Sequence, residues 1–370
     1  MNQLNGEKSA VRVALLGCGS IAERYIIGMR RFPETLAIAG CADVFPEAAT
    51  SLSKRTGIRA YTSVEELLAD PDVDLVVNIT PPVVHESMSL AAIAAGKHVY
   101  VEKPLTTEVN TAQRVLEAAQ RADLVVGAAP DTFLGSAAQT ARRAIDEGVI
   151  GTPIGATAAV RYSRAEEWHP DPSFLFQPGG GPSLDLGPYY VTALVNMLGP
   201  VAQVSAFSRI GALERQFTAE NRRADSVTVT TPTHASASLR FVNGAIGTLI
   251  SSFDIWDTSL PFIEIYGEKG TLQIGDPNEY DSPVWVRRHE DSDWWEYERA
   301  ITPTGEPGTP TQLLRGIGVA DLASSLSGTP LRASGSLALH VLEVIAAVDV
   351  SSERSEVVNI ASSVERPEPV

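Results

Sequence analysis

A lysine, an aspartate and a tyrosine stand in contexts that suit proton transfer to and from a hydroxyl group. Lys103 lies in Glu102-Lys103-Pro104, directly after the apolar run His98–Val101, and so at the carboxyl end of a predicted strand. A glycine run much further along the chain leads into Asp185-Leu186-Gly187-Pro188-Tyr189. A lysine in a desolvated site has a lowered pKa, which suits it to take or share a hydroxyl proton.

Asp185 and Tyr189 are four residues apart, so they share one face if Asp185–Leu198 is a helix, as its apolar spacing indicates. Tyrosine has a pKa of ~10 and needs a nearby cation to act as a base, and Lys103 could be that cation. The alternatives are that Lys103 is a surface residue of a loop and that Tyr189 packs at a domain interface. The glycine run and the acid before Tyr189 favour catalysis.

Three further residues could contact a polar substrate. Trp168 and His169 lie in Trp168-His169-Pro170-Asp171-Pro172, where two prolines predict a rigid loop that presents an indole and an imidazole. A surface loop with a packed tryptophan is an equal alternative. Asp131 follows a predicted strand near the junction of the two halves and could accept sugar hydroxyls. Weaker candidates are Asp276, Asn278 and Arg315, whereas His340 is expected to be a core histidine.

A glycine-rich turn predicts a dinucleotide site. Gly17-Cys18-Gly19-Ser20-Ile21-Ala22 follows the apolar run Val11–Leu16 and opens a predicted helix, which is the context that this motif requires. Gly17 would make the tight turn, and Gly19 would let the backbone approach a pyrophosphate. Cys18, Ser20 and Ile21 complete the turn and are expected to contact the cofactor. The alternative is a plain strand–turn–helix corner.

Asp43 ends the next apolar run, 26 residues after Gly17, against the ~20 that the motif leads us to expect. A carboxylate there can accept both ribose hydroxyls and would repel a 2′-phosphate. Val44 and Phe45 offer no cation for that phosphate, so the sequence favours NAD over NADP. The alternative is that Asp43 caps the helix that begins at Pro46.

Other predicted strands also end in residues that are expected to line the cofactor. Thr80-Pro81-Pro82 lies at such a strand end, where open parallel sheets bind ligands, and the two prolines hold the loop rigid. Glu102 and Lys103 end the following strand. For His85, a local hydrogen bond is as good an interpretation as contact with the cofactor.

The elements that carry these groups change character along the chain. Up to residue 130, runs that are apolar on both faces alternate with helices, which is typical of a doubly wound parallel sheet. The runs are Val11–Leu16, Leu36–Ala42, Leu75–Ile79, Val99–Val101 and Leu124–Val126, and helices are predicted over 21–31, 46–56, 85–95 and 107–121. Ser63 and Glu66 form a capping box at the start of a further helix.

From residue 131 the pattern predicts an α+β domain with an antiparallel sheet. Its strongest signal is a hairpin of His234–Val242 and Ala245–Phe253, where Asn243-Gly244 would supply a type I′ turn. A second hairpin is predicted over 262–274, and helices over 136–147, 318–327 and 336–351. Ala300–Thr311, rich in Pro, Gly and Thr, is expected to be a loop.

Composition excludes several classes of protein. A net charge of -16 opposes binding to nucleic acid or anionic lipid. Cys18 and Cys41 are expected to be buried thiols, and no Cys/His spacing suggests zinc. The first ten residues lack the apolar stretch of a signal peptide, and no apolar run reaches membrane-spanning length, so a cytoplasmic protein is expected.

Taken in order, these motifs resemble the Gfo/Idh/MocA oxidoreductases. The matching segments are Gly17–Ala22, Thr80–His85, the stretch 96–104 and Gly179–Asp185. The resemblance implies a Rossmann domain over 1–130 and an α+β domain with a large open antiparallel sheet over 131–370. It also implies that Lys103 is the active-site lysine and that Asp185 orients the substrate. Tyr189 replaces the histidine of many members, which is a departure from the family pattern.

The resemblance implies NAD-dependent hydride transfer to or from a hydroxyl carbon of a sugar, cyclitol or glycoside. Two alternatives stay open: glycoside cleavage through a transient keto intermediate, and a non-catalytic sugar sensor that binds the cofactor. Because one face of an open sheet needs a partner, we expect a homodimer or homotetramer joined through the second domain's sheet.

Overall fold

The structure is a computed structural model that describes residues 10–300 and 315–370. They fall into two compact units, and the positions of these units relative to one another are not determined. Unit 1 contains residues 10–102, 114–131 and 315–335, and unit 2 contains residues 103–113, 132–300 and 336–370. The loop predicted over Ala300–Thr311 lies outside the described residues except for Ala300.

Unit 1 is built on a five-stranded parallel sheet in the order β2-β1-β3-β4-β5. The strands are β1 (Val11–Leu16), β2 (Leu36–Ala42), β3 (Leu75–Asn78), β4 (His98–Val101) and β5 (Val126–Ala128). The strand order reverses between β1 and β3, and open parallel sheets bind their ligands outside the carboxyl ends of the strands at such a point. The predicted doubly wound sheet is therefore confirmed.

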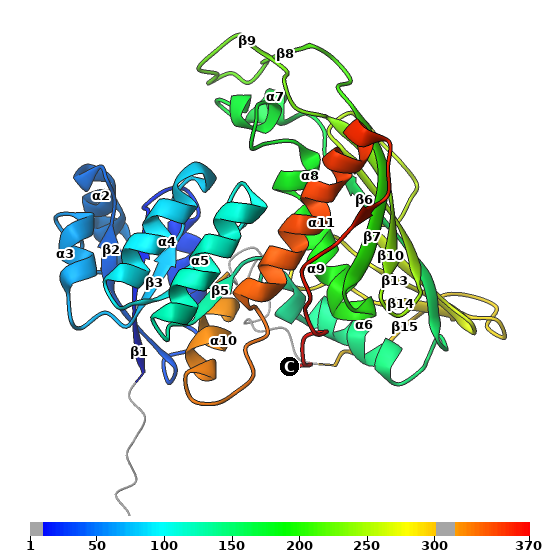
Figure 1. Cartoon of the computed structure of the whole chain (residues 1–370), viewed down its shortest axis with the longest axis horizontal. Coiled ribbons are helices and arrows are strands. Elements are labelled where there is room, and N and C mark those ends of the chain that lie inside the picture. The colour runs from blue at the N-terminus through cyan, green and yellow to red at the C-terminus, as the bar shows by residue number, and fades with distance from the viewer. Residues whose placement is uncertain (1–9, 301–314) are drawn as a thin grey trace, which may run out of the picture. The chain divides into compact units, whose positions relative to one another are not determined.

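Helices cover this sheet (Figure 1). They are α1 (Ala22–Met29), α2 (Pro46–Thr56), α3 (Val64–Ala69), α4 (His85–Ala94), α10 (Ile317–Ser325) and most of α5 (Val109–Arg121). Helix α10 comes from the far end of the chain and packs on α1, β4 and β5, which is why residues beyond the predicted boundary at 130 belong to unit 1. The capping box is confirmed, because the Glu66 N–H donates to the Ser63 hydroxyl at 3.1 Å.

Strand β5 begins two residues later than predicted. The reason is that the chain leaves α5 through a left-handed turn at Asp123, with φ of 55°. The Leu124 N–H then donates back to the Ala119 carbonyl at 2.9 Å, which ties Leu124 to the end of the helix rather than to the sheet.

Unit 2 contains a nine-stranded sheet in the order β15-β14-β13-β12-β6-β11-β10-β7-β16. Its strands are β6 (Pro153–Arg161), β7 (Val201–Arg209), β10 (His234–Phe241), β11 (Ile246–Ser252), β12 (Ile263–Gly267), β13 (Gly270–Ile274), β14 (Trp285–Arg288), β15 (Trp295–Glu296) and β16 (Val358–Asn359). The predicted antiparallel sheet is confirmed except for the central pair, β6 and β11, which run parallel.

The turn between β10 and β11 is not of type I′, so that prediction was wrong. Gly244 has a positive φ of 92°, but Asn243 does not. The Phe241 N–H donates to the Ala245 carbonyl at 2.9 Å, which closes a longer loop. Asn243 is held instead by its side chain, which donates to the Leu198 carbonyl at 2.9 Å.

The two faces of this sheet differ. On β10 the side chains of Ala235, Ala237, Leu239 and Phe241 are buried, whereas those of Ser236, Ser238 and Arg240 are exposed. Helices α6 (Ser136–Asp146), α9 (Gly187–Leu198) and α11 (Gly335–Arg354) lie on the buried face (Figure 1). Helix α11 is long and apolar enough to cross a membrane, but 61% of its apolar stretch is buried, as in a core helix.

A small lobe extends from one end of the sheet. It carries α7 (Ala165–Trp168), the 3-10 helix η3 (Ser173–Phe176), α8 (Pro182–Asp185) and a hairpin of β8 (Glu214–Gln216) and β9 (Ser226–Thr228). Its own core includes Phe176, Phe217 and Phe253. Arg215 binds Glu166 at 3.3 Å and also pairs with Asp254, so the hairpin is fastened to α7 and to the end of β11.

Candidate active site

Unit 2 brings Lys103, Asp185 and Tyr189 together. The Lys103 ammonium donates to the Asp185 carbonyl at 2.6 Å and to its Oδ1 at 2.9 Å. The same nitrogen lies 5.4 Å from the centroid of the Tyr189 ring, within range of a cation–π interaction. The Lys103 side chain is 16% exposed and that of Asp185 is 27% exposed, so the ion pair is partly shielded from water.

A break in the helix makes this arrangement. Asp185 ends α8 and Tyr189 lies in α9, so the predicted continuous helix from Asp185 to Leu198 is wrong. Pro188 has no N–H to donate to Leu184, and its ring would clash with that carbonyl. The chain restarts at Gly187, and the Tyr189 N–H donates to Leu186 at 3.1 Å. The Asp185 carbonyl, which a continuous helix would pair with Tyr189, therefore accepts from Lys103 instead.

Tyr189 itself is buried, with 3% of its surface exposed. It lies in the first turn of α9, on the Lys103 side of that helix. Its burial fits the predicted role in packing, and its position beside the Lys103 ammonium fits the predicted role in proton transfer. The neighbouring Tyr190 points elsewhere, because its hydroxyl lies 3.5 Å from Asp276 Oδ1, and burial raises the pKa of both groups.

Trp168 and His169 lie in unit 2 on the lobe, at the end of α7. The ring centroids of Trp168 and His169 are 5.5 Å apart, and that of Phe174 lies 5.5 Å beyond His169. His169 Nδ1 accepts the Asp171 N–H at 3.0 Å, which fixes the loop between the prolines. Because Trp168 and Phe174 are each 56% exposed, this row of rings remains available for contact with a ligand.

Tyr162 is a residue that sequence reasoning missed. It follows β6, its ring packs edge-on against Trp168 and Phe253, and burial followed by the charge of Asp185 raises its pKa. It therefore extends the row of aromatic rings from Trp168 to the core of the lobe at Phe253. Only its place at the end of a strand could have drawn attention to it.

In unit 1 the glycine turn has the form that a dinucleotide needs. Gly17 has a φ of 105°, and a Cβ there would come within 2.9 Å of the Ile79 carbonyl, so only glycine fits. A Cβ on Gly19 would meet nothing within 4 Å, which shows that its backbone has an open side. The Cys18 side chain is buried, whereas Gly19 and Ser20 are exposed and Ile21 is partly buried at the start of α1.

Asp43 ties the glycine turn to the end of β2. Its Oδ2 accepts the Cys18 N–H at 2.7 Å, and its Oδ1 accepts the Phe45 N–H at 3.0 Å. A carboxylate has about four lone-pair positions, so each oxygen can still accept a ribose hydroxyl. Asp43 is not the cap of α2, because Phe45 occupies that position and its side chain makes no capping bond.

Asn78 organises the turn that was predicted to line the cofactor. Its amide donates to the His85 carbonyl and to Ser89, each at 3.0 Å, and its Oδ1 accepts from the Thr80 hydroxyl at 2.6 Å. His85 is fully buried, with Nε2 2.8 Å from the Thr80 carbonyl, so its local hydrogen bond is observed. Pro81 and Pro82 are exposed beyond this turn and remain candidates for cofactor contact.

Glu102, which precedes Lys103 in the chain, is buried in unit 1. Its Oε1 accepts the Tyr25 hydroxyl at 2.9 Å and lies 3.6 Å from the Arg315 guanidinium. This network anchors the end of β4. The peptide bond from Lys103 to Pro104 is cis.

Asp131 is fully buried in unit 1, and its Oδ2 accepts the N–H groups of Gly316 at 3.0 Å and Gly318 at 2.9 Å. These bonds place a carboxylate at the start of α10, where unpaired N–H groups attract an anion. The expected contact of Asp131 with a sugar hydroxyl gains no support from these bonds, which are those of a helix cap.

The carboxyl ends of β1 to β4 thus bring the glycine turn, Asp43, Thr80 and Glu102 to one edge of the unit 1 sheet. The open side of Gly19, the start of α1 and the Asp43 carboxylate together fit a dinucleotide. Among residues 10–300 and 315–370, no group of three or more His, Cys, Asp or Glu side chains is placed to hold a metal ion. Cys18 and Cys41 are free, buried thiols, as predicted.

Comparisons with known proteins agree with this description. Residues 11–129 match a family described as "Oxidoreductase family, NAD-binding Rossmann fold", and residues 138–273 match the "GFO/IDH/MocA C-terminal domain". The 1,5-anhydro-D-fructose reductase of Ensifer adhaerens is 38% identical over 146 residues, which cover 39% of this chain and 44% of the reductase. The match therefore spans less than half of that relative.

Two further proteins resemble the chain over more of its length. The myo-inositol 2-dehydrogenase of Thermotoga maritima is 23% identical over 263 residues, covering 71% of this chain and 74% of the enzyme. A solved structure of levoglucosan dehydrogenase, in complex with NADH and L-sorbose, shares the fold with a TM-score of 0.82 and 19% identity, over 95% of this chain and 99% of that one. The chain belongs to the Gfo/Idh/MocA family of oxidoreductases, and its first unit has that family's NAD-binding Rossmann fold.

Proposed function

We propose that the protein is an NAD-dependent dehydrogenase that oxidises, or in reverse forms, a CH–OH group of a sugar, cyclitol or glycoside. The observation that carries this proposal is the position of Lys103, whose ammonium is held by two oxygens of Asp185 beside the Tyr189 ring. The compounds in the names of the three relatives are all polyhydroxylated sugars or cyclitols, in their hydroxyl or keto forms, which supports this class.

NAD bound at the glycine turn would supply the acceptor for the hydride. The protein then has to remove the hydroxyl proton as the C–H electron pair leaves, so that the C=O bond can form. The Lys103 cation beside Tyr189 stabilises the phenolate form of that tyrosine, which can take the proton. In the reverse direction the Lys103 ammonium stabilises the charge that develops on the substrate oxygen.

Asp185 acts in this scheme as a positioning residue as well as a substrate ligand. Its two bonds to Lys103 fix the direction of the ammonium, and its carboxylate balances the charge of the lysine. Trp168 and His169 would contact the substrate from the lobe.

NAD is proposed over NADP because Asp43 would repel a 2′-phosphate. Val44 and Phe45, which follow it, are 72% and 63% exposed and carry no charge that could bind such a group. The bonds of Asp43 to two backbone N–H groups keep its carboxylate at the end of β2.

We also infer that the protein is a cytoplasmic homodimer or homotetramer. The two buried free thiols fit a reducing compartment. On the exposed face of the nine-stranded sheet, Phe207 and Ile246 are 73% and 58% exposed, and Phe207 lies opposite Ser236 on β10. These exposed apolar side chains suit packing against a second sheet. Light scattering that shows a monomer at micromolar concentration would contradict this assembly.

The test is NADH formation by the purified full chain with myo-inositol, glucose, levoglucosan and L-sorbose, and NADH consumption with 1,5-anhydro-D-fructose. The proposal expects turnover with at least one of them and a higher kcat/KM with NAD than with NADP. Glycoside cleavage without added NAD would instead indicate transient oxidation. Sugar binding with no turnover of any compound would indicate a sensor.

A further inference from the structure

Tyr25 joins the helix that follows the glycine turn to the strand that leads to Lys103. It lies in α1 and is fully buried, and its hydroxyl donates to Glu102 Oε1 at 2.9 Å. We propose that Tyr25 is a positioning residue of the reaction, which holds the chain before Lys103 at a fixed place relative to the cofactor. The inference rests on the proposed dehydrogenase function and adds a role outside the group of Lys103, Asp185 and Tyr189.

One end of this connection is the cofactor site. Helix α1 begins at Ala22, the last residue of the glycine turn, and the Tyr25 N–H donates to the Ile21 carbonyl at 3.2 Å. Tyr25 therefore ends the first turn of α1, whose N–H groups would face the pyrophosphate of NAD. A shift of α1 along β4 would thus change the distance between the bound cofactor and the chain that carries Lys103.

The other end of the connection is β4, which Tyr25 contacts at two points. Its ring meets that of Tyr100 edge-on, with the centroids 6.4 Å apart, and its hydroxyl binds Glu102. Tyr100 and Glu102 are both buried, and because they are two residues apart in extended chain, their side chains point to the same face of the sheet. The Glu102 N–H donates to the Asn78 carbonyl at 2.9 Å, so the backbone at this point is tied to β3.

Tyr25 shares the Glu102 carboxylate with a cation. Arg315 Nη1 lies 3.6 Å from the oxygen that accepts from Tyr25, and the side chains of Arg315 and Glu102 are 9% and 8% exposed. Burial, followed by the charge of Glu102, raises the pKa of Tyr25, so its hydroxyl stays protonated and remains a donor. Without that hydroxyl, the buried carboxylate would be drawn toward Arg315 and away from α1, and the end of β4 would shift with it.

Such a shift matters because Lys103 follows Glu102 directly in the chain. The ammonium of Lys103 is held by Asp185, whereas its backbone continues from the end of β4. Tyr25 thus fixes the backbone end of the lysine, and Asp185 fixes the ammonium end. A displacement of reacting groups by about 1 Å can cost ~10²-fold in rate, so even a partial release of Glu102 should be measurable.

Tyr25→Phe tests the inference, because it keeps the ring against Tyr100 and removes only the hydroxyl. The matched control is Tyr61→Phe, since Tyr61 is 2% exposed in the same unit and its hydroxyl donates to Asp70 Oδ2 at 2.8 Å, at the end of α3. With the best substrate of the panel, we expect Tyr25→Phe to lower kcat about tenfold and to change KM and the NAD dissociation constant by less than about twofold. Tyr61→Phe should change all three by less than about twofold, and thermal melts should show a similar loss of stability in both variants.

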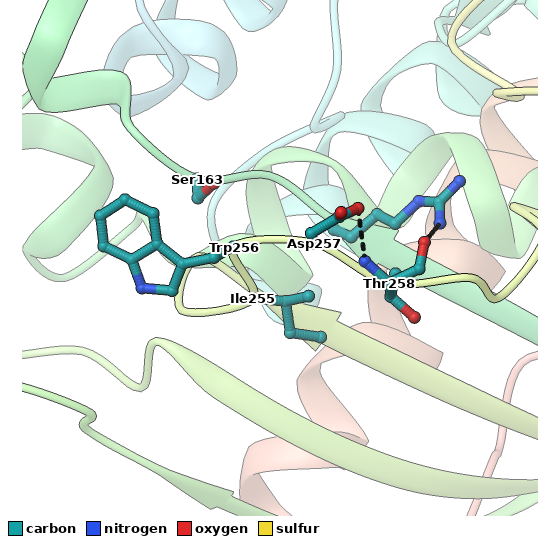
Figure 2. A pocket seen from close by; sticks show the side chains of 6 residues that line it. Ser163, Ile255, Trp256, Asp257 and Thr258 are labelled. Carbon is teal, nitrogen blue, oxygen red and sulfur yellow. Dashed lines mark hydrogen bonds between the residues drawn. The ribbon is translucent and has the colours of Figure 1, made fainter.

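Hydrogen exchange measured by mass spectrometry tests the anchor without turnover. Peptides over residues 98–106 should exchange at least about threefold faster in Tyr25→Phe than in the unchanged protein, and at the unchanged rate in Tyr61→Phe. Asp257→Asn is a second control, in an exposed loop of unit 2 that lines a pocket of about 250 Å³. There Asp257 Oδ1 accepts the Thr258 N–H at 2.8 Å (Figure 2). Asp257→Asn should change neither kcat nor the exchange over residues 98–106.

An unchanged kcat in a folded Tyr25→Phe enzyme would overturn the inference, whatever the exchange shows. An equal fall of kcat in Tyr61→Phe would overturn it as well, because the loss would then reflect stability alone. Since exchange does not depend on turnover, the two proposals can fail separately. If the unchanged protein oxidises no compound, faster exchange confined to Tyr25→Phe would keep Tyr25 as the anchor of the chain before Lys103 and reject the dehydrogenase. Full turnover by Tyr25→Phe would keep the dehydrogenase and reject the role of Tyr25.

Discussion

The Lys103 ammonium donates to two oxygens of a single residue, the carbonyl of Asp185 at 2.6 Å and its carboxylate Oδ1 at 2.9 Å. The carbonyl is available because the helix breaks before Pro188 and the Tyr189 N–H donates to Leu186. A proline that cannot donate a hydrogen bond thus frees the carbonyl of Asp185 for a lysine that lies 82 residues before Asp185 in the chain.

Pro188→Ala should weaken this arrangement. Alanine restores an N–H and allows α8 and α9 to join, so that the Asp185 carbonyl would pair with Tyr189 and Lys103 would lose one of its two acceptors. We expect kcat to fall about tenfold while thermal stability is unchanged or higher. Pro182→Ala, at the start of α8 where no such bond is involved, should leave kcat unchanged. A Pro188→Ala enzyme with full turnover would show that the break has no catalytic role.

Tyr189→Phe removes the hydroxyl and keeps the ring that lies beside Lys103. If the phenolate takes the substrate proton, kcat should fall by about 10² or more, because a positioned acid or base contributes ~10²–10⁴. Turnover should be measured across pH, with NAD binding as the control. Undiminished turnover at every pH would assign Tyr189 to packing and leave the proton to Lys103 or His169.

Asp43→Asn should narrow the preference for NAD. The substitution keeps an acceptor for the Cys18 N–H, which Asp43 binds at 2.7 Å, but removes the charge that repels a 2′-phosphate. Dissociation constants for NAD and NADP should be measured by fluorescence titration for both proteins. The prediction fails if the unchanged protein binds NADP as tightly as NAD. It also fails if the ratio of the two dissociation constants is the same in Asp43→Asn as in the unchanged protein.

His340 should make unit 2 less stable in acid. Its Nε2 accepts the Val201 N–H at 3.0 Å, and burial lowers its pKa in the folded protein below the ~6.5 of an exposed histidine. As pH falls, the unfolded chain therefore takes up the proton first, so the stabilising effect of His340 is complete above about pH 6.5 and declines below it. His340→Leu should cost about 1–3 kcal/mol at pH 8 and less at pH 5 in urea unfolding. A loss of stability in His340→Leu that is larger at pH 5 than at pH 8 would contradict this prediction.

Much of the fold could be predicted because local signals and tertiary structure agree. β1, β2 and α2 have the predicted bounds, since each is bounded by residues that stop it, such as Gly57 with its φ of 77° after α2. The type of the 243–244 turn could not be predicted, because the Asn243 side chain is held by Leu198, 45 residues away in the chain.

The candidate site was predicted less completely. Lys103, Asp185 and Tyr189 carry recognisable spacings, and the structure brings them together. The cap that Asp131 forms on α10 depends on Gly316 and Gly318, 185 and 187 residues further along, and no local pattern reveals such a partner. The helix break was the more avoidable omission, because Pro188 stands in the sequence and lacks the N–H that a continuous helix needs.

The most direct test is the rate of NADH formation by Lys103→Ala with the best substrate of the panel, measured beside its NAD affinity. Removal of the cation should lower kcat by at least about a hundredfold, with the NAD dissociation constant changed by less than about threefold. Lys103→Arg keeps the positive charge but has a different shape, so its kcat should lie between those of the unchanged enzyme and of Lys103→Ala. An alanine variant that oxidises the substrate at the rate of the unchanged enzyme would contradict the assignment of Lys103 as the centre of the active site.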